Sequence, residues 1–298
     1  MAEVPAPLIT VVMIFLNAER FIAEAIESVR QQTLKDWELV LVDDGSSDGS
    51  SAIARSFAQQ DCRIRYIDHP GHVNRGASAS RNVGAASSSA EFLAFIDADD
   101  VWVPEKLAEQ VSILRREPDL AMVCGALRYW SSWDPAATEA DRTVLTGNLA
   151  DQRLDPPAGA VGMYPLTSAP GAGVDFLVRR RIFADVGGFE DAFPGLYDDQ
   201  SFLLKVYLRH SVFFSARIWL WYRQHGASLC ATTLRSDAEY RRLRDAFLRW
   251  LQKHVRDHGL GGAEVRRALR RALVENRLRG WWNRFRSSLR TAKRLALP

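Results

Sequence analysis

Apolar and polar residues over the first 117 positions alternate in a pattern that predicts strands and helices in turn. Short, mostly apolar runs are typical of strands that are covered on both faces of a sheet. The stretches between them carry apolar residues at helical spacing, or small residues that let a helix lie close to a sheet. The predicted strands are residues 8–16, 37–44, 63–68 and 92–97, and a predicted helix follows each. This alternation favours a mostly parallel sheet with right-handed crossovers.

The second half of the chain begins with a region that lacks a sustained period. Residues 131–173 are rich in Pro, Gly and Ala, and a connection this long is more often a functional loop than part of the core. Over residues 175–214 the pattern predicts a strand, a short helix, a GGFED turn and a helix that begins near Asp198. Beyond residue 232 the chain is helical and rich in arginine.

The net charge of the chain changes sign near residue 231. Residues 232–298 hold 18 Lys and Arg against 6 Asp and Glu, a net charge of +12, so residues 1–231 carry −9 of the total of +3. We therefore predict an α/β domain over residues 1–231, with halves at about 1–125 and 126–231, and a basic helical extension after it. The apolar runs are too short to span a membrane and MAEVPAP does not resemble a secretory signal, so we expect a cytoplasmic protein.

Carboxylates gather at the ends of two of the predicted strands. Asp43 and Asp44 follow the last apolar residue of the second strand, and Asp97, Asp99 and Asp100 follow the last apolar residue of the fourth. Parallel strands end at the same edge of a sheet, where open α/β sheets bind ligands, so the two clusters should share one crevice. Like charges this close repel each other unless a cation, hydrogen bonds or protonation offsets the repulsion. Asp100 suits the start of the next helix, whereas Asp97 and Asp99 offer the oxygen ligands that Mg²⁺ or Mn²⁺ prefers.

Several segments, taken in order, resemble the family 2 glycosyltransferases, which have the GT-A fold. They span about residues 8–230, and their order makes the resemblance more specific than any single motif. The segments are LITVVMIFLNAERFI, QQTLKDWELVLVDDGSSDGS, NRGASASRNVG, FLAFIDADDVWVPEKL, GGFED, YDDQSF and YRQHGAS. The resemblance implies an α/β fold with a Rossmann-like sheet flanked by helices. It also implies transfer of a sugar from a nucleotide diphosphate donor with inversion at the anomeric carbon.

The resemblance assigns residues to the donor pocket. Asp44, and with it Asp43, would bind the base or ribose of the nucleotide. Phe15 and Asn17 would border that pocket. Arg81 would face the nucleotide, since a guanidinium can pair with a diphosphate. UDP sugars are the favoured donors.

The metal and the general base follow from the resemblance in the same way. Asp97, Ala98 and Asp99 match the family's DxD element, which implies that they bind the donor and its Mn²⁺ or Mg²⁺ ion, with Asp99 as a direct metal ligand. His225 falls where related enzymes place a residue near the metal or the diphosphate. Asp199 matches the acidic residue that acts as the general base.

The sequence departs from the family pattern in three places. The Pro-x-Tyr/Phe-Asn pattern of the first loop is Ile14-Phe15-Leu16-Asn17 here, so no aromatic residue stands at the usual position for stacking on the base. Asp198 replaces the usual Glu. The QxxRW element of processive synthases does not follow YDDQSF. We therefore expect addition of one sugar and its release. The resemblance implies a glycan or lipid-linked acceptor in lipopolysaccharide, capsule or exopolysaccharide assembly, and a protein acceptor stays open.

Two other functions fit part of the pattern. The DADDV segment also fits the signature of haloacid-dehalogenase-type phosphatases, with Asp97 as nucleophile and Asp99 as acid/base. Those enzymes need a lysine before a later acidic pair, and none lies between Lys106 and Lys205. The other function is non-catalytic binding of a sugar nucleotide, against which stands the presence of all the candidate catalytic carboxylates.

The basic tail has two interpretations. Apolar residues within 277–296 fall along one side of a helix, with Arg and Lys elsewhere. They are Leu278, Trp281, Phe285 and Leu289 and, more weakly, Ala292 and Ala296. This helix either packs on the preceding domain or, through residues 277–298, makes a peripheral contact with anionic lipid on the inner face of the membrane. No recognised nucleic-acid-binding module accompanies the charge, so we expect no nucleic-acid partner.

Overall fold

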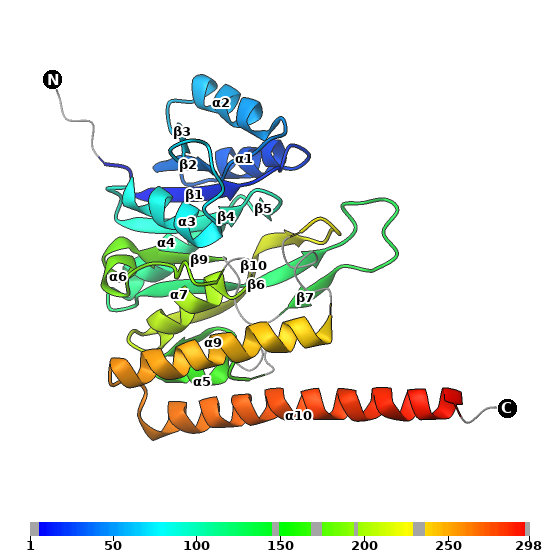
Figure 1. Ribbon diagram of the computed structural model, residues 1–298. Coiled ribbons are helices and arrows are strands. Elements are labelled where there is room, and N and C mark those ends of the chain that lie inside the picture. Colours follow the sequence, from blue (N-terminus) through cyan, green and yellow to red (C-terminus); the bar gives the residue numbers. More distant parts are fainter. Residues whose placement is uncertain (1–5, 145–148, 168–174, 194–195, 229–235, 296–298) are drawn as a thin grey trace.

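The computed structural model is built around a β-sheet with helices packed against it (Figure 1). It describes residues 6–144, 149–167, 175–193, 196–228 and 236–295, and only the backbone of residues 279–295. The strands are β1 (Ile9–Phe15), β2 (Trp37–Asp43), β3 (Ile64–Asp68), β4 (Phe92–Asp97), β5 (Val101–Trp102), β6 (Met122–Trp130), β7 (Arg142–Val144), β8 (Gln152–Leu154), β9 (Phe176–Arg179) and β10 (Val212–Arg223). The helices are α1 (Ile22–Arg30), α2 (Ser50–Gln60), α3 (Ala77–Ala86), α4 (Lys106–Arg116), α5 (Ala158–Gly162), α6 (Arg180–Asp185), α7 (Asp198–Tyr207), α9 (Asp237–Asp257) and α10 (Gly262–Leu295).

The first four strands are parallel, as the sequence predicts. β1 pairs with β2 on one side and with β4 on the other, and β2 pairs with β3. The register places Phe15 opposite Asp43 and Ile14 opposite Asp97, so these three strands end together. The carboxylates at the ends of β2 and β4 therefore lie at the same edge of the sheet, on either side of β1.

The pairing changes beyond β4, where the sheet continues in the order β9-β6-β10-β5. β9 runs antiparallel to both β4 and β6, and β10 then pairs in parallel with β6. The connection between β6 and β9 explains this reversal, because it leaves β6 at the carboxyl edge and β9 starts again from that edge. The sheet is therefore parallel in its first half and mixed in its second.

The connection itself has more regular structure than its composition predicts. The described part of residues 131–173 contains the short elements β7, β8 and α5. Strands of three residues and a helix of five are too short to show a period, so the hydrophobic pattern misses them. Residues 145–148 and 168–173 of this predicted loop lie outside the described residues.

Each face of the sheet packs against its own hydrophobic cluster, because successive side chains of a strand point to opposite faces. On one face Val12 and Val40 join residues of α7, α9 and α10. On the other face Val11 and Leu39 join residues of α1 and α4. Gly84 lets α3 lie directly on the first face, since a Cβ at this position would overlap the Val12 side chain.

The basic extension forms the helices α9 and α10, which lie side by side at the end of the molecule opposite β3 (Figure 1). Phe247, Leu248 and Leu251 of α9 and Val265 of α10 are fully buried in the first cluster. Further along α10, Leu278 is 53 % exposed. The side chains of the predicted apolar face beyond it lie outside the described residues. No helix in the described part of the chain is long and apolar enough to cross a membrane.

Candidate functional site

Asp43, the last residue of β2, is buried and holds the turn that begins there. Its Oδ1 accepts a hydrogen bond from Ser46 N at 2.8 Å, and its Oδ2 accepts bonds from Tyr66 Oη at 2.9 Å and from Ser51 Oγ. Burial alone would raise the pKa of Asp43, but these donors outweigh it and lower the pKa. Asp43 is therefore ionised at neutral pH, and its hydrogen bonds fix the shape of the turn.

Asp44 holds the loop that precedes α3. Its Oδ1 accepts a hydrogen bond from Arg75 N at 2.7 Å, and its Oδ2 accepts one from Gly76 N at 3.1 Å. Gly45 has a φ of +86°, and a Cβ there would lie 2.8 Å from Asn74 N, so only glycine fits between the turn and the loop. The two predicted nucleotide-binding carboxylates thus sit at a tightly packed junction.

Asn17 joins this junction from the end of β1. Its Oδ1 accepts a hydrogen bond from Ser47 N at 2.8 Å. Phe15 is only 3 % exposed and packs into the core, whereas the neighbouring Leu16 is 43 % exposed. Of the predicted residues of the first loop, Asn17 therefore lies at an exposed position beside the Asp43–Asp44 turn, and the Phe15 ring lies within the core.

Arg81 of α3 forms a buried bridge between two carboxylates that are far apart in the sequence. Its Nη2 donates a hydrogen bond to Asp97 Oδ1 at 2.6 Å, and its Nη1 donates one to Asp198 Oδ2. The guanidinium is covered by the Phe189 ring, whose centroid lies 5.4 Å away. Burial disfavours the charge of Arg81, but Asp97 and Asp198 offset this effect and raise its pKa. Among the described contacts, the side-chain hydrogen bonds of Arg81 go to this acidic pair, and the turn after β2 receives none of them.

The segment that follows β4 is fixed to the end of β10. Asp99 Oδ2 lies 2.9 Å from His225 Nε2, and the Asp99 carbonyl accepts a hydrogen bond from Arg223 Nε at 2.7 Å. Asp100 is fully buried, and its Oδ1 accepts a bond from Arg223 N at 2.9 Å. Burial, together with the charges of Asp99 and Asp97, raises the pKa of Asp100 well above its ordinary value. Asp100 therefore anchors the segment, and Asp99 remains partly exposed.

The predicted metal ligands are only partly brought together. Asp99 and His225 are in contact, whereas Asp97 is paired with Arg81. Within the described residues, no group of three or more His, Cys, Asp or Glu side chains is arranged to hold a metal ion. One or two carboxylates with room for phosphate oxygens and water fit Mg²⁺ or Mn²⁺, so Asp99 and its neighbours fit such an ion when a diphosphate completes the ligand set. The side chain of Ala98 is buried in the core.

Asp199 lies beside Asp198 in the first turn of α7. Its Oδ1 accepts a hydrogen bond from Gln200 N at 2.7 Å, and its Oδ2 accepts one from Gln200 Nε2 at 3.2 Å. Burial and the negative charge of Asp198 raise the pKa of Asp199 to about 7, although Arg81 acts in the opposite direction. A carboxyl group with this pKa can accept a proton near neutral pH.

Residues 10–184 of the chain match the family model described as glycosyl transferase family 2. The chain belongs to this family. The match supports the glycosyltransferase class, and the phosphatase interpretation of the Asp97 segment finds no support in it.

Curated relatives are glycosyltransferases as well. The uncharacterized glycosyltransferase RP339 of Rickettsia prowazekii (strain Madrid E) is 26 % identical over 251 residues, which cover 83 % of this chain and 74 % of the relative. The UDP-Glc:alpha-D-GlcNAc-diphosphoundecaprenol beta-1,3-glucosyltransferase WfgD of Escherichia coli is 36 % identical over 107 residues. That match covers 35 % of this chain and 41 % of WfgD.

Solved glycosyltransferase structures share the fold. TarS 1–349 of S. aureus in complex with UDP-GlcNAc superposes with a TM-score of 0.61 at 18 % identity, over 80 % of this chain and 65 % of TarS 1–349. The mannosyltransferase PcManGT of Pyrobaculum calidifontis, in complex with GDP-Man and Mn²⁺, has a TM-score of 0.59 at 17 % identity. This match covers 99 % of this chain and 81 % of PcManGT. These similarities confirm the GT-A type of α/β fold expected for a family 2 glycosyltransferase.

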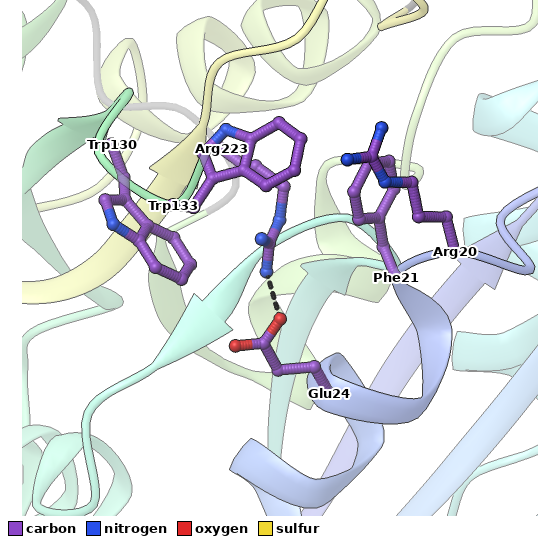
Figure 2. Close-up of a pocket in the computed structure, with 6 residues that line it drawn as sticks. All are labelled: Arg20, Phe21, Glu24, Trp130, Trp133 and Arg223. Atoms are coloured by element: carbon purple, nitrogen blue, oxygen red, sulfur yellow. Dashed lines mark hydrogen bonds and ion pairs between the residues drawn. The ribbon is translucent and has the colours of Figure 1, made fainter. Parts of the chain in front are cut away.

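The structure also gathers residues that the sequence analysis does not single out. Trp130, Trp133, Phe21 and Arg223 line a pocket beside the Asp99 segment (Figure 2). Arg223 lies in the matching segment YRQHGAS, which is the one signal that could have pointed to it. The tryptophans come from the end of β6 and the connection after it, where the sequence shows no motif.

We expect replacement of Arg81 by Met to destabilise the fold by about 3–5 kcal/mol, because it leaves Asp97 and Asp198 as unpaired, largely buried charges. Urea unfolding at pH 7 measures this loss. Arg65→Met is a matched control, since Arg65 pairs with Glu38 near the surface and its loss should cost about 1 kcal/mol or less. Equal losses in the two variants would contradict the importance of the bridge.

Proposed function

We propose that the protein transfers one sugar from a nucleotide diphosphate sugar to an acceptor hydroxyl, with inversion, in the assembly of a cell-surface glycan. The observation that carries this proposal is the Arg81 bridge. It joins the segment that holds Asp99, after β4, to the helix end that holds Asp199. A carboxylate suited to a metal-bound diphosphate and a carboxylate suited to accept a proton therefore belong to one connected site.

The donor is proposed to bind along the carboxyl edge of β1, β2 and β4. The junction of Asn17, Asp43 and Asp44 would receive the nucleoside, and Asp99 with His225 would receive the diphosphate end. UDP is the favoured nucleotide, since TarS is described in complex with UDP-GlcNAc and WfgD is named for UDP-Glc. PcManGT, described with GDP-Man, makes GDP sugars the alternative. Phe15 and Ala98 would act through the backbone, because their side chains face the core.

A divalent cation would be held by Asp99, with Asp97 and His225 as further candidate ligands. Mn²⁺ accompanies GDP-Man in PcManGT, which supports Mn²⁺ or Mg²⁺ here. Such an ion, when bound, supplies positive charge against the diphosphate as it leaves. The negative charge of residues 1–231 would otherwise repel the donor.

Asp199 is proposed to act as the general base. The acceptor oxygen forms a bond to the anomeric carbon while the bond from that carbon to the diphosphate oxygen breaks. The electron pair of the broken bond leaves with the nucleoside diphosphate, and the proton of the acceptor hydroxyl goes to Asp199. Attack from the side opposite the leaving group inverts the anomeric configuration.

The C-terminal part of α10 is proposed to contact anionic lipid, which would bring the site to a lipid-linked acceptor on the inner face of the membrane. The sequence from Asn276 to the last residue contains no Asp or Glu. WfgD, whose name includes a diphosphoundecaprenol acceptor, supports a lipid-linked substrate.

Thermal-shift measurements with UDP-GlcNAc, UDP-Glc and GDP-Man, each with and without Mn²⁺, test the donor site. One nucleotide class should stabilise the protein in a metal-dependent way, by roughly 2.7 kcal/mol when the ligand is at 100 times its Kd. Asp99→Ala should abolish this stabilisation, and the exposed-site control Asp119→Ala should retain it. Equal stabilisation of Asp99→Ala and the wild type would sink the metal assignment.

Replacing Asp199 with Asn should lower turnover by about 10²- to 10⁴-fold, because the base is lost. In the wild type kcat/KM should rise as pH increases through about 7, since only the ionised carboxylate accepts the proton. This rise should be missing from the residual activity of the variant. Near-normal transfer by Asp199→Asn would remove Asp199 from the role of base.

The same substitution has an expected effect on stability. The pKa of Asp199 is about 7 in the fold, against an ordinary pKa of 3.8 for an aspartate, so between these pH values the folded protein holds a proton that the unfolded chain releases. Stability from this group is therefore present at low pH and is lost as pH rises through 7. The stability of Asp199→Asn relative to the wild type should therefore increase from pH 5 to pH 8, which thermal unfolding measures. A stability difference that stays the same over this range would contradict the raised pKa.

Co-sedimentation of the full chain with vesicles tests the membrane contact. The protein should bind phosphatidylglycerol vesicles more strongly than phosphatidylcholine vesicles. Replacing Arg284, Arg286 and Arg290 with Gln should weaken this binding roughly 10²-fold, at about 1 kcal/mol per charge. The same change at Arg266, Arg267 and Arg270 is the control for charge alone, and equal effects of both triple variants would rule out a specific role for the tail.

A further inference from the structure

A pocket of about 270 Å³ lies beside Asp99, and none of the residues that line it has a role in the proposed transfer. Its walls come from three separate segments: Arg20, Phe21 and Glu24 around the start of α1, Trp130 and Trp133 at the end of β6 and just after it, and Arg223 at the end of β10. A volume slightly below the usual range for ligand pockets suits a small group such as one sugar ring. Figure 2 shows Arg223 directed toward Glu24, with the Trp130 indole on one side and Phe21 and Arg20 on the other.

Arg223 forms the fixed back of the pocket. Its Nη2 donates a hydrogen bond to Glu24 Oε2 at 2.5 Å, and its Nε donates one to the Asp99 carbonyl. Its guanidinium carbon lies 4.4 Å from the Trp130 ring centroid and 5.0 Å from that of Trp133. Since Arg223 is 3 % exposed and already paired, its charge is neutralised inside the pocket.

Arg20 differs from Arg223 because it brings a positive charge that has no carboxylate partner among the described residues. Its guanidinium lies over Trp133 at 4.7 Å and over Phe21 at 5.3 Å, at an exposed position. Contact with ring faces orients the guanidinium and leaves its N–H groups available at the edge. A planar fork of this kind pairs best with a carboxylate or a phosphate.

The remaining walls suit a sugar ring. Trp133 is held in place by a hydrogen bond from its Nε1 to the Gln224 carbonyl at 2.9 Å. Indole faces can cover the C–H surface of a pyranose, and the half-exposed carboxylate of Glu24 can accept hydrogen bonds from sugar hydroxyls. The Phe21 ring also contacts the His225 ring at 4.7 Å, so a ligand here would lie next to the Asp99–His225 pair.

We propose that this pocket binds one sugar ring of the acceptor, and that this ring carries an anionic group, a carboxylate or a phosphate, which pairs with Arg20. The inference rests on the proposed transfer reaction and names the chemistry of its acceptor. In this proposal Arg20 and Trp133 recognise the acceptor and do not bind the donor.

Saturation-transfer NMR on the full-length protein, with UDP and Mn²⁺ in excess, tests the assignment. Three probes are compared: methyl β-D-glucuronide, glucose 1-phosphate and the neutral methyl β-D-glucoside. At least one anionic probe should bind about tenfold or more tightly than the neutral one, as a charge-assisted hydrogen bond predicts. Binding of the glucuronide alone identifies a carboxylate, and binding of the sugar phosphate alone identifies a phosphate.

The variants Arg20→Gln and Trp133→Phe decide whether this binding takes place in the pocket. Both substitutions should weaken the binding of the anionic probe. In Arg20→Gln the anionic probe should bind no more tightly than the neutral glucoside. Arg116→Gln, an exposed arginine at the end of α4, is the matched control and should behave as the wild type. Equal binding of all three probes, or no binding of any, would overturn the proposal.

UDP affinity, measured by calorimetry in the same variants, distinguishes a failure of the acceptor assignment from a failure of the proposed function. Weaker UDP binding in Arg20→Gln would place the pocket in the donor site and so overturn the acceptor assignment. If the wild type binds no nucleotide sugar at all, the proposed function fails. If it binds a nucleotide sugar but the probes do not discriminate, only the inference about the acceptor fails.

Discussion

The buried bridge from Arg81 to Asp97 and Asp198 is the interaction on which the site depends. It brings together the end of β4 and the start of α7, whose carboxylates would otherwise repel each other. A guanidinium suits this position because its planar fork can donate to two acceptors at once, which a lysine ammonium on a flexible stem does less well. Arg81 engages Asp97 and Asp198, and their neighbours Asp99 and Asp199 are the carboxylates proposed to bind the metal ion and to act as the base.

The carboxylates at this edge of the sheet are of two kinds, buried and partly exposed. Asp43, Asp44 and Asp100 accept hydrogen bonds from backbone amides and are buried, so each of them fixes a loop. Asp99 and Asp199 keep some exposure, and the surroundings of Asp199 raise its pKa toward neutrality. The repulsion that the sequence makes evident is thus relieved by ordinary protein contacts for most of these residues.

Local patterns in the sequence were enough to predict the first half of the fold. The four parallel strands, the small-residue helix α3 and the common edge of the Asp43 and Asp97 clusters all follow from periods and turns within short windows. The antiparallel β9 could not be predicted, because its direction depends on where a long connection returns to the sheet. The partners of Arg81 could not be predicted either, since the bond to Asp198 joins residues 117 positions apart. The pocket around Arg223 was missed for the same reason, because its pairing with Glu24 spans 199 positions.

The packing of α9 also bears on how far the chain can be shortened. Phe247, Leu248 and Leu251 cover the face of the core that is built on β6, β9 and α7. The match to the family ends at residue 184, well before this cover. A fragment cut to the matched residues would leave that face open to water and prone to association with other chains. The hydrophobic core of this protein therefore extends beyond the part of the chain that matches its family.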